Sequence, residues 1–131
     1  MALGIDLRAQ IDTETFKGLM LVNGGGAVAL LALLNPVISR PEEHLFGYWI
    51  MAGIALMALG AGLAVVHNYY RRQCSLAYEN NEPRGFSMFG QPLREPRVCK
   101  TGWNCLIASV LCFFAAATVV TVGGFLTAIP H

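Results

Sequence analysis

The chain has 131 residues, of which 55% are hydrophobic and 13% charged, whereas a soluble domain carries about 25% charged residues. The charges avoid three long stretches, residues 18–39, 45–66 and 101–130, and a bilayer core about 30 Å thick needs about 20 helical residues to cross it. This distribution excludes a nucleic-acid-binding protein, a soluble catalytic domain and a disulfide-stapled secreted module. It predicts a single-domain, all-α integral membrane protein with three transmembrane helices.

The first predicted span covers residues 16–34. Asp12 can cap a helix and favours the positive end of the helix dipole, so we expect this helix to begin near it, several residues before the membrane. Residues 5–15 would then form a short interfacial segment. Asn35-Pro36 follows the span, and because proline cannot continue a helix we expect the first helix to end there.

Aromatic side chains bracket the second predicted span, residues 46–70. Such amphipathic rings prefer the level of the lipid headgroups. They are Tyr48, Trp49, Tyr69 and Tyr70. The third predicted span, residues 103–128, starts at Trp103 and lies in an uncharged stretch longer than one crossing requires, so we expect a tilt or an interfacial turn at one end.

Basic residues near the spans predict the orientation, because Lys and Arg concentrate in cytoplasmic loops. One side of the predicted bundle carries Arg8, Lys17, Arg71, Arg72, Arg84, Arg94, Arg97 and Lys100. The connection between the first two spans carries only Arg40. The sequence therefore predicts a cytoplasmic N-terminus, an outside C-terminus and a cytoplasmic loop over residues 71–102.

Small residues recur along the second and third spans, and such residues let transmembrane helices approach closely. The third span repeats them about every four residues, and the second carries a comparable face. The positions are Ala108, Cys112, Ala116 and Gly124, and Gly53, Gly60 and Ala64. We expect these faces to be helix–helix contacts, either within one chain or between subunits.

The first span contains the run Asn23-Gly24-Gly25-Gly26, which weakens an isolated helix and is better tolerated where neighbouring helices pack closely. A buried Asn side chain in a membrane usually finds a hydrogen-bond partner on another helix. We therefore predict that all four residues form helix–helix contacts, with Asn23 as a polar link.

Two stretches, LMLVNGGGAVALLALL and HNYYRRQCSLAYE, resemble a group of small, uncharacterised bacterial inner-membrane proteins in which an Asn-Gly-Gly-rich apolar helix opens the chain. The resemblance covers about a third of the sequence. It implies a location in the bacterial inner membrane, and the group brings no activity that could be assigned to this chain.

No Asp, Glu, Lys or Arg lies in the three charge-free stretches, residues 18–39, 45–66 and 101–130, which argues against a proton pump or a charge-coupled transporter acting through one copy. The polar residues at depth are Asn23, Ser109, Thr118 and Thr121. Hydroxyls of this kind usually bond back to their own helix. An oligomeric pore lined by hydroxyls and small residues remains an alternative.

His67 lies beside a span among headgroup-level residues, and we expect a structural role for it. Cys74, Cys99 and Cys105 flank the predicted loop and could meet if the second and third helices pack antiparallel, but their spacing is unlike that of structural zinc sites. They are weak metal candidates. Thiols facing the cytoplasm stay reduced, so we expect no disulfide framework, and we expect no cofactor.

The predicted loop combines basic and apolar side chains, which need cover from the membrane surface or from a partner protein. Its candidates for headgroup or partner contact are Arg71, Arg72, Phe86, Phe89, Arg94 and Arg97.

The sequence thus predicts a non-catalytic integral membrane subunit or scaffold that self-associates or belongs to a larger bacterial membrane complex. Its expected partners are the lipid bilayer and other copies or membrane subunits, with no nucleic acid. The alternative is a homo-oligomeric pore or membrane-permeabilising protein, and a third hypothesis is a metal- or thiol-dependent activity at the loop.

Overall fold

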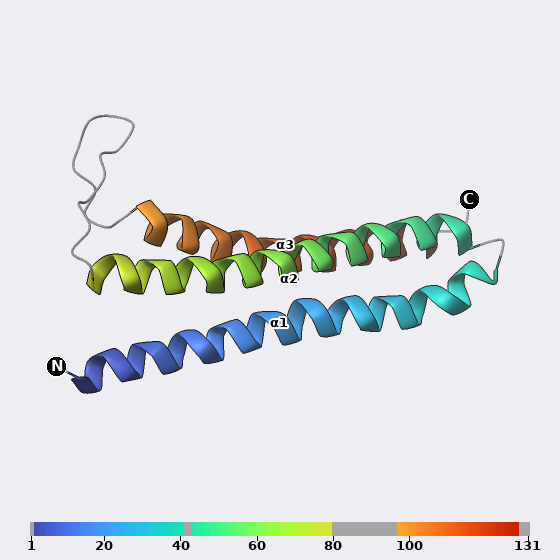
Figure 1. Ribbon diagram of the computed structural model, residues 1–131. Coiled ribbons are helices and arrows are strands. Elements are labelled where there is room, and N and C mark those ends of the chain that lie inside the picture. The colour runs from blue at the N-terminus through green and yellow to red at the C-terminus, as the bar shows by residue number, and fades with distance from the viewer. Residues whose placement is uncertain (1, 41–42, 80–96, 129–131) are drawn as a thin grey trace, which may run out of the picture.

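Three long helices run antiparallel to their neighbours in the chain (Figure 1). The computed structural model describes residues 2–40, 43–79 and 97–128, with the backbone alone for residues 2–9 and 77–79. The helices are α1 (Ala2–Ile38), α2 (His44–Glu79) and α3 (Arg97–Ala128). The start of α1, the end of α2 and the start of α3 therefore lie at one end of the bundle.

Each helix contains a segment that is long and apolar enough to cross a membrane. These segments are Gln10–Ile38, His44–Leu76 and Arg97–Ala128, with 29, 33 and 32 residues. At 1.5 Å per residue they are about 43–50 Å long, which exceeds the hydrocarbon core of about 30 Å. The prediction of an all-α chain with three helices of membrane-crossing length is confirmed, and the helix ends are long enough to reach the headgroup region.

The predicted ends of the first helix were wrong at both termini. α1 begins at Ala2, so Asp12 lies inside it, and the helix continues through Pro36 to Ile38. A proline in the last turn removes only one helical hydrogen bond, and carbonyls near this end are satisfied locally. Ser39 Oγ donates to the Asn35 carbonyl at 3.2 Å, and the Arg40 N–H donates to Val37 O at 3.1 Å.

The predicted loop over residues 71–102 is partly helical. Residues 71–79 continue α2, and residues 97–102 form the beginning of α3. The sequence has no proline or glycine between Arg71 and Glu79, so nothing local interrupts the second helix there.

Buried positions on α2 are mostly separated by three or four residues, the spacing of left-handed helix pairs. α2 packs against both α1 and α3, which have little contact with each other. Its buried seam consists of Gly47, Ile50, Gly53, Met57, Gly60, Ala64, His67 and Cys74. On α3 the buried residues are Cys99, Gly102, Ser109, Ala116 and Gly123, so most recur every seven residues instead of every four.

Leu34, Val37 and Ile50 form a buried apolar cluster between α1 and α2, near the turn that joins them. On α3, Gly123 lies against the indole of Trp49, where a Cβ would be 2.5 Å from Trp49 Cβ and 2.7 Å from Cδ2. Real Cβ atoms do not approach other atoms so closely, so only glycine lets the ring lie on the backbone. We call this part of the bundle the apolar end.

Gly123→Ala should destabilise the bundle by about 1–3 kcal/mol, because the added methyl group forces Trp49 away from α3. Gly62→Ala is the matched control: no atom lies within 4 Å of a Cβ at that position, so the change should be neutral or slightly stabilising. Unfolding of both variants in detergent, followed by circular dichroism, measures the difference. Equal stability would contradict the close contact between Trp49 and Gly123.

Candidate functional site

A polar junction joins all three helices near the middle of the bundle. Asn23 of α1 donates from Nδ2 to Ser109 Oγ of α3 at 3.3 Å, and Ser109 Oγ donates to the Gly60 carbonyl of α2 at 2.8 Å. The same Nδ2 donates to Leu19 O of its own helix at 3.2 Å. Asn23 and Ser109 are fully buried, so this chain of hydrogen bonds lies inside the bundle.

The junction depends on the absence of a side chain at Gly60. A Cβ there would collide with Asn23 Oδ1 and would lie 2.8 Å from Asn23 Cγ and 3.1 Å from Cys112 Cβ. Glycine therefore allows the amide of α1 and the backbone of α3 to approach α2 together. Interhelical hydrogen bonds of this kind contribute about 0.6–2 kcal/mol each in membranes.

Asn23 Oδ1 is buried without a hydrogen-bond partner among the described residues. Its nearest surroundings include Gly60, whose Cα–H is at most a weak donor. Leaving a buried acceptor unpaired costs about 1–3 kcal/mol, which offsets part of what the two Nδ2 bonds contribute. The junction therefore fixes the positions of the helices more than it stabilises the bundle.

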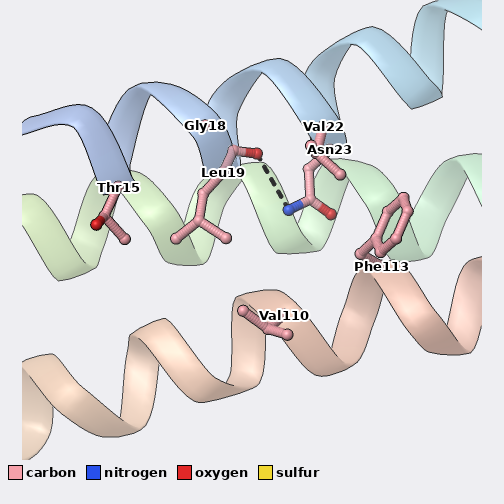
Figure 2. Close-up of a pocket in the computed structure, with 7 residues that line it drawn as sticks. All are labelled: Thr15, Gly18, Leu19, Val22, Asn23, Val110 and Phe113. Carbon is pink, nitrogen blue, oxygen red and sulfur yellow. Dashed lines mark hydrogen bonds between the residues drawn. The ribbon is translucent and has the colours of Figure 1, made fainter.

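An apolar groove of about 290 Å³ lies between α1 and α3 beside this junction (Figure 2). Its lining residues are Thr15, Gly18, Leu19, Val22, Asn23, Val110 and Phe113. The Thr15 hydroxyl donates to Ile11 O at 2.9 Å, and the Asn23 amide nitrogen bonds within the bundle. The groove thus presents no ionisable group, and its shape and lining suit an apolar chain.

His67 links α2 to α3 closer to the N-terminal side of the bundle. Its ring is buried, and Nδ1 lies 2.7 Å from the Gly102 carbonyl oxygen. Because a carbonyl only accepts, Nδ1 carries the proton and donates this hydrogen bond. His67 therefore holds two helices together at the depth where the sequence analysis placed a structural residue.

Asp12 of α1 and Arg71 of α2 form an ion pair one turn beyond His67. About one third of each side chain is exposed, so water screens the pair and its contribution is small. Lys17–Glu14 and Arg40–Glu43, each at 2.8 Å, are in contrast local pairs between residues three apart in the sequence. Asp12 therefore bonds to another helix and does not cap its own.

Cys74 and Cys99 form a disulfide bond, which overturns the expectation that these thiols stay reduced and unpaired. The antiparallel packing of α2 and α3 brings their Cα atoms to 5.1 Å, within the usual range for a disulfide. We call the region of this bond, His67 and the Asp12–Arg71 pair the polar end. The two bonded sulfurs provide no thiolate ligand.

No group of three metal-ligating side chains occurs among the described residues. Cys105 and Cys112 are free thiols, both partly buried on α3. With Cys74 and Cys99 bonded to each other, the three-cysteine arrangement considered from the sequence is not assembled.

The structure places most of the predicted contact residues against another helix. Gly26 lies against Met57, Gly53 against Val120, and Gly124 against Phe46. Ala64 and Ala116 are fully buried, whereas Ala108 and Cys112 are partly buried. Gly24 and Gly25 differ, because a Cβ at either position would meet no atom within 4 Å.

Ser109 of the junction and Gly123 of the apolar end were not predicted as helix–helix contacts from the sequence. Ser109 was grouped with hydroxyls that bond to their own helix, as Thr118 does to Phe114 O at 2.8 Å, but Ser109 bonds to α2. Gly123 was overlooked beside Gly124. A seven-residue repeat from Gly102 through Ser109 to Gly123 is the sequence signal that identifies both.

The predicted headgroup or partner contacts lie partly within the described residues. Arg71 belongs to the interhelical ion pair, and Arg72 and Arg97 are exposed. Phe86, Phe89 and Arg94 lie outside the described residues.

Comparisons with known proteins give no relative: no protein-family model, no curated protein and no solved structure matches this chain.

Ser109→Ala should lower the stability of the bundle by about 0.6–2 kcal/mol, because it removes the hydrogen bonds to both Asn23 and Gly60. Thr118→Ala is the matched control, since the Thr118 hydroxyl bonds within its own helix and the change should stay within about 0.5 kcal/mol. Reversible unfolding in mixed detergent micelles measures both. Equal effects would show that the junction contributes nothing to helix association.

Gly60→Leu should disrupt the junction more strongly, because its side chain would occupy the position of the Asn23 amide. We expect a loss of more than about 3 kcal/mol, beyond the usual cost of overpacking. Gly62→Leu provides the control, since no atom lies within 4 Å of a Cβ at that position of α2. A stable Gly60→Leu chain would contradict the close approach of the three helices.

Proposed function

We propose that this protein is a non-catalytic integral membrane subunit or scaffold, self-associating or part of a larger complex in the bacterial inner membrane. One observation carries the proposal. The three buried polar side chains of the described residues, Asn23, His67 and Ser109, all hydrogen bond to another helix. The buried polar groups of the described residues thus connect helices, which supports a structural role.

The orientation belongs to the same proposal. The basic residues near Arg71 and Lys17 lie at the polar end, and Arg40 lies at the opposite end. Because basic residues favour the cytoplasmic side, the polar end and the N-terminus face the cytoplasm and the C-terminus faces outward. The expected partners are lipid, other copies of the chain or other membrane subunits.

The outer face of α1 supports association with another subunit. Gly24 and Gly25 have no neighbouring atoms within 4 Å of a Cβ, so another helix can approach the α1 backbone there without displacing a side chain. Gly60, in contrast, is occupied by contacts within the chain. Substitutions at Gly60 therefore test the fold, and substitutions at Gly24 and Gly25 test assembly.

Gly25→Leu should lower the mass of the assembled particle without lowering membrane insertion or the stability of the single chain. The measurement is native mass spectrometry after gentle extraction of the tagged protein from its membrane. Gly62→Leu, at an open position on α2, is the control.

The composition of the particle tests the wider proposal. A multiple of 14.2 kDa identifies a self-assembled scaffold, and other polypeptides at fixed stoichiometry identify an accessory subunit. A single chain of 14.2 kDa, extracted under conditions that preserve known complexes of the same membrane, would contradict the proposal.

A homo-oligomeric pore is the second candidate, favoured by the exposure of Thr118 and Thr121 on the outer face of α3. If several copies turned this face toward a shared axis, the hydroxyls would line it. Reconstituted protein should then pass ions or small solutes. The scaffold proposal expects liposomes that stay tight at verified high incorporation.

A further inference from the structure

Cys74 lies near the C-terminal end of α2, and Cys99 is the third residue of α3. Because the two helices are antiparallel, both cysteines lie at the same end of the bundle. Both residues are buried, with 9% and 7% of their surface exposed. Their bond is the only covalent link between helices in the described part of the chain, apart from the backbone itself.

The location of this bond is unusual under the proposed orientation, on which the inference rests. The basic residues at the polar end orient that end toward the cytoplasm. In the cytoplasm, thiol pools keep cysteines reduced, and disulfides are usually transient or redox-sensing. A permanent structural disulfide is typical of the opposite, oxidising side. The charge distribution and the disulfide are compatible if the bond opens and closes.

The bundle has other contacts that would hold it together when the bond is open. His67 bonds to Gly102, and Arg71 pairs with Asp12, so α2 stays linked to both neighbours at the polar end. The Asn23–Ser109 junction and the apolar end lie farther from the disulfide along the helices. Opening the bond should therefore loosen one end of the α2–α3 pair and leave the three-helix bundle folded.

The two sulfurs are not equivalent. Cys99 lies in the first turn of α3, where the positive end of the helix dipole favours a thiolate. Cys74 lies toward the negative end of α2. Because the better-stabilised thiolate leaves faster, an attacking thiol should bond to Cys74 Sγ and release Cys99.

We propose that Cys74 and Cys99 form a redox-reversible clasp between α2 and α3, exchanging with low-molecular-weight thiols of the glutathione type. In the opening direction, an external thiolate attacks Cys74 Sγ and releases the Cys99 thiolate, which takes up a proton. A second thiolate then attacks the external sulfur of the mixed disulfide and releases Cys74. The sum converts two thiols and the protein disulfide into one small disulfide and two protein thiols, and closing is the reverse.

The state of the clasp can be trapped in cells by rapid acid quenching, followed by alkylation with a maleimide of high mass. We expect Cys74 and Cys99 to be mostly thiols in growing cells, to become a disulfide during brief exposure to a thiol oxidant, and to return after its removal. Helicity of the purified chain should be the same in both states. A pair that stays bonded in untreated cells, or stays reduced under the oxidant, would overturn the proposal.

The orientation is tested separately, so that the two failures can be told apart. Ala128→Cys is labelled in intact cells with a membrane-impermeant maleimide, in a chain whose four native cysteines are serine. Labelling from outside together with a permanently bonded pair would sink the clasp and leave the orientation standing. Absence of labelling, with full labelling after permeabilisation, would overturn the orientation itself and with it the basis of the clasp.

The direction of exchange has its own readout. Two variants, Cys74→Ser and Cys99→Ser, each leave one cysteine of the pair, and Cys105 and Cys112 are replaced by serine in both variants. Near neutral pH, Cys99 in the first variant should react with iodoacetamide roughly two- to fivefold faster than Cys74 in the second. Equal rates, or the reverse order, would overturn the assignment of Cys99 as the leaving thiolate.

Discussion

The arrangement of the three helices depends on the close approach of Asn23 and Ser109 to the bare backbone of Gly60. Lipid tails are as apolar as leucine side chains, so burial of apolar surface does little to draw helices together in a bilayer. Close backbone contact and interhelical hydrogen bonds remain as the main attractive terms. The junction supplies both at one point, and it fixes how far each helix can slide along the others.

The two ends of the bundle are held by different kinds of interaction. At the apolar end, Leu34 and Ile50 pack together and Trp49 lies on Gly123, so small changes in side-chain volume are felt directly. At the polar end, a disulfide, a histidine–carbonyl bond and an ion pair join the helices. The apolar end is therefore held by packing of side chains, and the polar end by specific bonds between individual groups.

The sequence predicts the number of helices, their antiparallel order and their membrane-crossing length. It does so because burying charge in lipid is costly, so a segment that crosses a membrane appears as a long run without charged residues. The ends of α1 could not be predicted. Pro36 and Asp12 are only weak signals for a helix end, and the flanking residues on both sides also adopt helical structure. The disulfide was missed for a different reason. The expected antiparallel packing already allowed Cys74 and Cys99 to meet, but the predicted cytoplasmic location implied that their thiols stay reduced.

The contact faces show why helix packing is only partly readable from a sequence. A four-residue repeat, such as the one ending at Gly124, drifts around a helix that turns every 3.6 residues, whereas a seven-residue repeat stays on one seam of a left-handed pair. Gly24 and Gly25 illustrate the complementary limit, since their composition suggested contact but the chain itself leaves them uncovered. Whether a small residue packs within the chain or stays uncovered therefore depends on the rotation of its helix, which the composition of a glycine run does not encode.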